Sequence, residues 1–194
     1  MTFQFKIQLK NINDPTVWRR VVVPADLTFL QFHTVIQVSF GWFDCHLFQF
    51  SPNGWGSSPQ IKLPDEDSFS PFAKKVDSLD PENVMLSDIF TSEKQKYAYI
   101  YDFGDDWNHQ ITLEKILEDK ILHARCIKAS GACPPEDCGG PWGYQNLKEV
   151  LADKKHPEHK DTKEWLGLSA KEKWDVEAFD LELINQELIE IELE

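Results

Sequence analysis

The chain has 194 residues, of which 41% are hydrophobic and 12% aromatic, enough apolar material for one sizeable core. Its 20 basic and 33 acidic residues give a net charge of −13, which disfavours a simple electrostatic grip on nucleic acid. The apolar runs are too short to cross a bilayer, and no secretory signal opens the chain. Four cysteines are too few for a disulfide scaffold, so we expect a cytoplasmic protein with no membrane partner.

The first half of the chain predicts strands around one early helix. Residues 3–10 alternate apolar with polar side chains, as in a strand with one buried face, and residues 17–23 predict a second strand. Thr28 is placed to cap a helix over residues 29–40, which ends at Gly41. The segments that follow are an extended stretch over residues 45–50, a loop over 64–83 and one helical turn over 86–90.

The second half opens with a predicted hairpin and ends in helices. Tyr97, Tyr99 and Tyr101 share one face of its first strand, and residues 102–106 form the turn into a return strand over 107–113. The later segments are a strand near 121–127, an irregular loop over 133–140, helices over 141–153 and 158–165, and a last helix after Asp175 that buries Val176, Phe179 and Leu183. Residues 189–193 have the period of a strand, and helix and strand both stay open there.

Strands dominate the first two thirds and helices the last third, which is typical of an α+β fold. We therefore predict a largely antiparallel sheet, which a crossover through the early helix would make mixed, with a C-terminal helical third. No change in composition marks a boundary, so residues 1–194 are expected to form a single domain.

Several motifs, taken in this order, resemble the plasmid pRiA4b ORF-3-like family. They are Trp18-Arg19-Arg20, Phe40-Gly41-Trp42, His46-Leu47, Tyr101-Asp102-Phe103-Gly104-Asp105 with Trp107 and His109, Cys133-Pro134-Pro135-Glu136-Asp137-Cys138-Gly139-Gly140 with Gly143-Tyr144, and Phe179-Asp180 with Asn185. The resemblance spans nearly the whole chain and implies one α+β domain. It implies no established activity, because the family is uncharacterised.

The resemblance also implies a link to mobile elements, and the chain differs from the family pattern at one position. Some relatives carry names that link them to mobile elements, which implies genomic company and not chemistry. Members often have a second histidine two residues after the first, whereas this chain has His46-Leu47-Phe48. A metal or catalytic role for that second imidazole therefore cannot hold here.

The predicted hairpin carries the strongest candidate for catalysis. His109 lies on the apolar face of its strand, and Asp102 or Asp105 in the turn could hold its ring. With the Glu136-Asp137 loop, this set could serve a metal-dependent enzyme. We favour the structural interpretation, a buried histidine beside a turn that its own aspartates stabilise.

The arginine pair supports a structural role for the turn. Whichever way the strand faces, Arg19 or Arg20 lies beside an apolar face, where an unpaired guanidinium is costly. We predict that the aspartates of the 102–106 turn or Glu136-Asp137 pair with it. The candidate binding residues are Arg19, Arg20, Trp107, Glu136 and Asp137.

A metal site is the less favoured interpretation of the cysteines. Cys126, Cys133 and Cys138 have wider spacings than zinc knuckles usually have, so packing thiols are the default. His33 could meet His46 across the contact of the early helix with the next strand, as another candidate metal or acid–base pair. We predict no cofactor, with zinc as the one alternative.

Function remains open between two classes. We favour a non-enzymatic binding or interaction module, associated with mobile elements through its family. The seven tryptophans and thirteen phenylalanines exceed what a core of this size needs, so some should face a partner. A protein or small ligand fits the charge better than nucleic acid. The alternative is a metal-dependent enzyme built on His109, Asp102, Asp105 and the Glu136-Asp137 loop.

Overall fold

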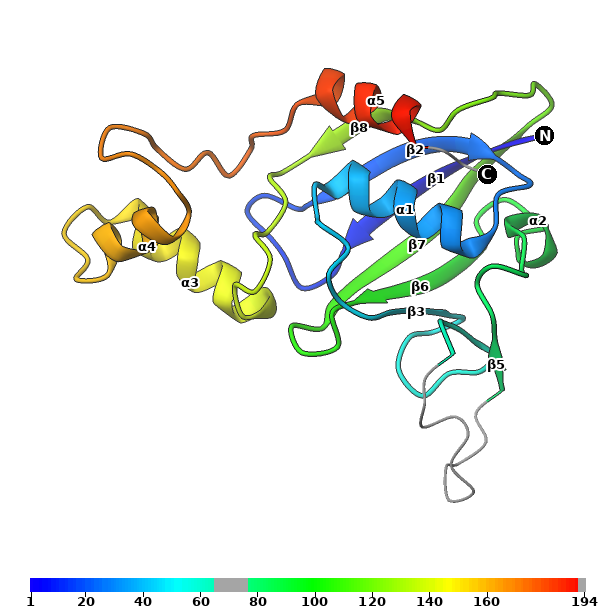
Figure 1. The fold of residues 1–194 in the computed structure, drawn as a ribbon, viewed down its shortest axis with the longest axis horizontal. Coiled ribbons are helices and arrows are strands. Elements are labelled where there is room, and N and C mark those ends of the chain that lie inside the picture. Colours follow the sequence, from blue (N-terminus) through cyan, green and yellow to red (C-terminus); the bar gives the residue numbers. More distant parts are fainter. Residues whose placement is uncertain (65–76, 192–194) are drawn as a thin grey trace.

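The computed structural model describes residues 1–64 and 77–191, which form one sheet with helices at its face and its ends (Figure 1). The elements are β1 (Thr2–Leu9), β2 (Trp18–Pro24), α1 (Phe29–Phe40), β3 (Phe48–Ser51), β4 (Gln60–Ile61), β5 (Ser78–Leu79), α2 (Leu86–Ile89), β6 (Lys96–Tyr101), β7 (Trp107–Leu117), β8 (Arg125–Ser130), α3 (Gly140–Ala152), α4 (His159–Trp165) and α5 (Leu181–Glu190).

The strands follow the order β5-β4-β3-β6-β7-β1-β2-β8. Every neighbouring pair is antiparallel except the short β4–β5 pair, so the predicted α+β class with a largely antiparallel sheet is confirmed. The N-terminal strand β1 lies between β2 and β7, inside the sheet. The long β7 pairs with both β6 and β1, and so connects the strands on either side of it into one sheet. The turn that leads into β7, residues 102–106, lies at one end of this sheet.

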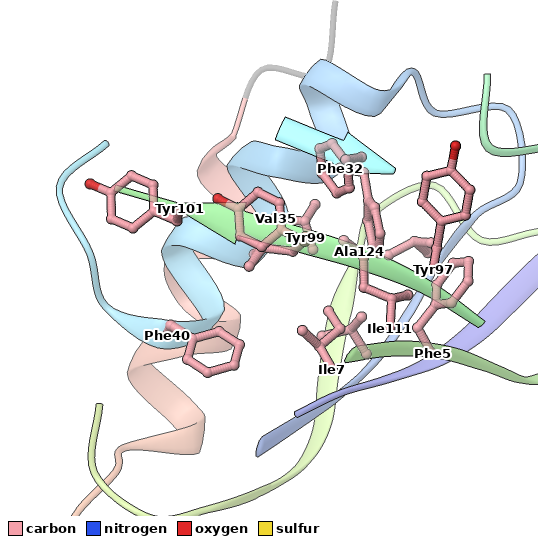
Figure 2. Packing of buried hydrophobic residues seen from close by; sticks show 14 of the residues in the cluster. Phe5, Ile7, Phe32, Val35, Phe40, Tyr97, Tyr99, Tyr101, Ile111 and Ala124 are labelled. Atoms are coloured by element: carbon pink, nitrogen blue, oxygen red, sulfur yellow. The ribbon is translucent and has the colours of Figure 1, made fainter. Parts of the chain in front are cut away.

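Helix α1 covers one face of the sheet and forms the core with it (Figure 2). Phe32, Val35 and Phe40 project from the helix toward the aromatic row of β6 and the apolar side chains of β1. The predicted ends of this helix are confirmed. Thr28 and Gln31 form a capping box, and Gly41 closes the helix in the left-handed conformation.

The predicted elements of the C-terminal third are found with two shifts. Strand β8 begins at Arg125, four residues later than predicted, and α5 begins at Leu181, not after Asp175. Asp175 caps only an isolated turn, through a hydrogen bond from the Glu177 amide, whereas Asp180 accepts hydrogen bonds from two amides at the start of α5.

The residues that α5 buries also differ from the prediction. Ile184 and Leu188 are buried, while Phe179 and Leu183 are exposed and Val176 is only half-buried. Helix α5 continues through Ile189 to Glu190, and residues 192–194 lie outside the described part of the chain. Irregular segments separate α3, α4 and α5, so this third is helical only in part.

Within the predicted loop over residues 64–83, residues 65–76 lie outside the described ranges. Its described end contains β5, which pairs with β4, and both of these two-residue strands were missed by the sequence analysis. In the described residues, no helix combines the length and apolar character needed to cross a membrane.

Candidate functional site

The site lies at one end of the sheet, where three loops meet. They are residues 41–47 between α1 and β3, residues 102–106 between β6 and β7, and residues 131–139 ahead of α3. The Asp102 amide donates to the Leu47 carbonyl at 2.9 Å, and the Phe43 amide donates to Glu136 Oε1 at 3.0 Å. In Figure 1 the β6–β7 turn lies beside the first turn of α3. Segments far apart in the sequence are thus bonded together here.

Glycines permit the close contact of these loops. A Cβ at Gly140 would overlap the Asp105 carbonyl, and one at Gly143 would overlap the Cys138 carbonyl. The Gly139 amide also donates to Asp105 Oδ2 at 3.1 Å. The glycine-rich text before α3 therefore holds the loop against the β6–β7 turn.

Four side chains converge where the three loops touch. The imidazole Nε2 of His46 lies 3.3 Å from Asp137 Oδ1, 3.7 Å from Asp102 Oδ2 and 3.9 Å from Glu136 Oε2. We call His46, Asp102, Glu136 and Asp137 the carboxylate–imidazole cluster. Cys45 adds a thiol, because its sulfur lies within 4.8 Å of the ligand atoms of His46 and Glu136.

Hydrogen bonds orient two of these carboxylates. Glu136 Oε1 accepts from the Tyr101 hydroxyl at 2.9 Å as well as from the Phe43 amide, and Asp102 Oδ1 accepts from the Gly104 amide at 2.9 Å. Burial raises the pKa of Tyr101, and the bond to Glu136 raises it further, so the phenol stays protonated and donates. Each carboxylate keeps its other oxygen for His46.

Among the described residues, no lysine or arginine pairs with this cluster. Across residues 1–64 and 77–191, no ion pair joins a basic side chain other than His46 to Asp102, Glu136 or Asp137. The predicted pairing of Arg19 or Arg20 with these acids is therefore wrong. Arg20 pairs with Glu114 on β7, at 2.6 Å.

Arg19 is buried without a carboxylate. Its Nε donates to the Ser39 carbonyl at 2.7 Å, and its Nη1 donates to three further carbonyls, of Trp18, Ser130 and Gly131. The guanidinium also lies over the ring of Phe40, and burial lowers its pKa. Backbone carbonyls therefore stabilise the guanidinium in place of the carboxylate predicted from the sequence. The aspartates of the 102–106 turn consequently have no arginine partner among the described residues.

His109 belongs to the core and not to the cluster. It is fully buried, with the rings of Phe40 and Trp42 meeting it edge-on, and its Nδ1 contacts the Tyr99 carbonyl at 3.3 Å. Burial lowers the pKa of His109 to about 3, so the ring is neutral at physiological pH. Among the described residues, no hydrogen bond or ion pair links it to Asp102 or Asp105.

Exposed apolar side chains surround the acids. Trp142 is 88% exposed and Phe43 is 83% exposed. Trp142, Asp105 and Asp106 line one groove, together with Lys148. We call this surface the acidic–aromatic face; its members are Phe43, Leu47, Trp55, Phe103, Trp142, Asp105, Asp106 and Asp137, with the largely buried carboxylates of Asp102 and Glu136 next to them.

The known sequences that resemble this chain extend across this site. The sequence model of the family described as "Plasmid pRiA4b ORF-3-like protein" matches residues 1–183. The chain belongs to this family. An "Uncharacterized protein y4hQ" from Sinorhizobium fredii (strain NBRC 101917 / NGR234) is 38% identical over 172 residues, which cover 86% of this chain and 81% of that protein.

A solved structure confirms the fold of this family member. The crystal structure titled "Protein of Unknown Function MM3350 from Methanosarcina mazei Go1" is similar with a TM-score of 0.77 and 34% identity. The similarity extends over 93% of this chain and 95% of the Methanosarcina mazei chain. The relatives carry no functional description, so the chemistry of the pRiA4b ORF-3-like site must be argued from its geometry.

The family motifs acquire structural roles. Trp42 donates from its indole to the Pro134 carbonyl at 3.0 Å and packs parallel to Phe40, which anchors the proline-rich loop to the end of α1. Asn185 of α5 holds both the amide and the carbonyl of Cys126 on the edge strand β8. These motif residues stabilise the fold. The cluster residues belong to the same motifs, but their carboxylates pair with no lysine or arginine among the described residues.

The cysteine and histidine candidates for a metal site are dispersed. Burial raises the pKa of Cys133, and it raises the pKa of Cys138 to about 12, so both are thiols at neutral pH. The thiol of Cys126 is buried on β8 and donates to the Lys128 carbonyl. His33 uses both ring nitrogens, on the Tyr99 hydroxyl and on Asp44. None of these four residues joins a set of metal-compatible ligands in the described ranges. His46 is the member of the predicted set that does.

Trp107, another candidate, is fully buried. Every cluster member is among the residues predicted from the sequence, but the acids were assigned to His109, and His46 was placed beside His33. Tyr101 and Cys45 were not predicted to lie beside the cluster. The spacing of His46 before a buried strand is the signal that could have placed its side chain at the sheet's end.

Proposed function

We propose that this family member is a non-enzymatic binding module that recognises a lysine- or arginine-rich protein segment on its acidic–aromatic face. The observation that carries the proposal is that exposed aromatic rings lie beside carboxylates that form no ion pair with a lysine or arginine among the described residues; Lys148 lines the same groove but donates to the carbonyls of Asn13 and Asp14. We take the chain as one domain acting in the cytoplasm, in keeping with its four free cysteines.

The chemistry of the face favours a cationic partner. Unmatched carboxylates attract ammonium and guanidinium groups, and they repel phosphates. Exposed tryptophan and phenylalanine rings add cation–π contacts and apolar area at little cost in side-chain entropy. Trp142 shares a groove with Asp105 and Asp106, and the Phe43 amide bonds to Glu136, so a segment crossing the face would contact both rings.

A peptide titration tests this function. A short peptide that alternates lysine with glycine should bind the full chain, with affinity that falls as salt rises, while the glutamate counterpart should not bind. Trp142→Ala should weaken binding by about tenfold, since truncating an exposed aromatic anchor costs about 1–2 kcal/mol. Trp165→Ala is the matched control, because Trp165 is also exposed but lies on α4.

Two results would overturn the proposal. One is equal binding of the lysine and glutamate peptides, and the other is an equal effect of Trp142→Ala and Trp165→Ala. A mobility-shift assay at low salt tests whether the protein binds nucleic acid instead. We expect no complex because of the net charge of −13. The association with mobile elements remains part of the proposal and rests on the plasmid named in the family's description.

A metal-dependent enzyme is the second candidate, and the carboxylate–imidazole cluster is the observation in its favour. His109 would take no part in it, since its buried ring does not reach the acids. Metal-dependent turnover of simple phosphate or carboxylate esters that Glu136→Gln abolishes would favour the enzyme. Turnover that the substitution leaves unchanged would indicate a contaminant.

A further inference from the structure

We propose that the carboxylate–imidazole cluster is a binding site for a divalent transition-metal ion, with Zn²⁺ as the best-fitting ion. Two overlapping sets of ligand atoms share His46 Nε2: one is completed by Asp102 and Asp137, the other by Glu136 and the Cys45 thiol. The site is independent of the peptide-binding proposal, because the metal can be measured on the protein alone.

The distances within the cluster fit a shared ion better than direct bonding. None of the contacts of His46 Nε2, at 3.3, 3.7 and 3.9 Å, has hydrogen-bond geometry. Zinc binds nitrogen and oxygen ligands at about 2.0–2.2 Å, so two ligands at a tetrahedral angle lie roughly 3.4 Å apart. Side-chain rotations would bring the atoms of either set onto one ion, because within each set the ligand atoms lie within 4.8 Å of one another.

Two buried atoms point into the cluster without a partner. His46 Nε2 and Glu136 Oε2 are both buried and accept or donate no hydrogen bond within the described residues, and the Glu136 side chain is only 10% exposed. A buried carboxylate oxygen without a hydrogen-bond partner destabilises the folded state, because burial removes its hydrogen bonds to water and no protein donor replaces them. An ion between these atoms satisfies both at once.

The surrounding donors already hold the ligands in a metal-binding arrangement. The Tyr101 hydroxyl and the Phe43 amide fix one oxygen of Glu136, and the Gly104 amide fixes one oxygen of Asp102. Such outer hydrogen bonds orient metal-binding carboxylates in known sites. Each carboxylate therefore presents its second oxygen toward His46.

The charge and donor types select the ion. Three carboxylates and a neutral imidazole carry a charge of −3, so a divalent ion leaves the cluster negative and the face still acidic. An imidazole nitrogen favours zinc and its neighbours over magnesium, which prefers an all-oxygen shell. Asp137 is 72% exposed, so the ion has a route from solvent.

Zinc titration of the full chain tests this site. After stripping with chelator, calorimetry at neutral pH should show one Zn²⁺ per chain with a Kd below about 0.1 mM, and magnesium should bind at least about a hundredfold more weakly. Glu136→Gln and Asp137→Asn should each weaken zinc binding by at least about tenfold. Asp137→Asn is informative if Glu136→Gln does not fold, because Asp137 is exposed.

Matched controls locate the ion. Glu164→Gln on the exposed face of α4 should leave zinc binding unchanged, and so should Cys138→Ser, which removes a thiol from the neighbouring loop. Nuclear magnetic resonance of the imidazoles should show the His46 signals shifting on zinc addition while those of His109 stay fixed. Zinc binding weaker than about 0.1 mM, or wild-type affinity in Asp137→Asn, would overturn the proposal.

Discussion

Arg19 and Arg20 are adjacent in sequence and differ sharply in what their charges do. Arg19 is buried and spends its donors on backbone carbonyls, while Arg20 forms a half-exposed pair with Glu114. The pair with Arg20 lowers the pKa of Glu114 and raises that of Arg20. The two substitutions should therefore differ in their effect on stability.

We predict that Arg19→Ala lowers the free energy of unfolding by at least about 3 kcal/mol, because it leaves buried carbonyls without donors. For a chain of this length that corresponds to a fall in Tm of roughly 6–12 °C. Arg20→Ala should cost less, about 1 kcal/mol, because its pair with Glu114 is partly exposed to solvent. Urea unfolding of both variants checks this, and equal losses would contradict the assignment.

The buried His109 gives the second residue-scale prediction. Its folded pKa, about 3, is below the ordinary value of 6.5, so the unfolded chain binds the proton more readily. The stability from its neutral form is complete above pH 6.5 and is lost as pH falls toward 3. Between pH 7 and 5.5 this loss is about 1 kcal/mol.

His109→Phe should remove that part of the pH dependence, because phenylalanine keeps the ring and has no proton to bind. Unfolding curves of wild type and variant at pH 7 and 5.5 give the comparison, in which other titrating groups cancel. A variant that loses as much stability as the wild type on acidification would show that His109 is not the buried neutral group.

Among the elements, the loop before α3 matters most for the site, because it supplies Glu136 and Asp137. Its position depends on α3 starting close to the β6–β7 turn, which Gly140 and Gly143 permit. The packing of α3 therefore affects the position of the loop that carries Glu136 and Asp137, because a side chain at Gly143 would overlap the Cys138 carbonyl.

We predict that Gly143→Ala weakens zinc binding by at least about tenfold, since its Cβ would push against the Cys138 carbonyl and displace the loop. Gln145→Ala, on the same helix and bonded only to Glu149 in the described residues, should leave zinc affinity unchanged. Calorimetry on both variants decides the matter. Equal affinities would mean that the loop tolerates the added methyl group.

The sequence predicted elements better than contacts, for a physical reason. The strand β1, the capped helix α1 and the β6–β7 hairpin follow from local periodicity and capping, which residues near one another determine. The partners of Arg19 and His46 depend on loops that meet across the fold, and periodicity carries no information about them. Asp175 and Asp180 show a related limit, because both start a turn and only packing decides which one starts a helix.

For the whole molecule, the distribution of charge connects fold and function. Residues 175–194 hold eight of the 33 acidic residues and no lysine or arginine, so much of the net charge belongs to the C-terminal segment of the sequence. The cluster is distinctive because its acids are partly buried, oriented and unmatched. The central claim is that this face accepts positive charge from outside the chain, as an ion between the ligands of the cluster and as basic side chains around them.

Crystals of the full chain grown with zinc test this claim most directly, through anomalous diffraction at the zinc absorption edge. We predict one strong peak within bonding distance of His46 Nε2 and at least two of the three carboxylates, Asp102, Glu136 and Asp137. A map with zinc only at other histidines or cysteines, and the cluster unchanged, would contradict the account.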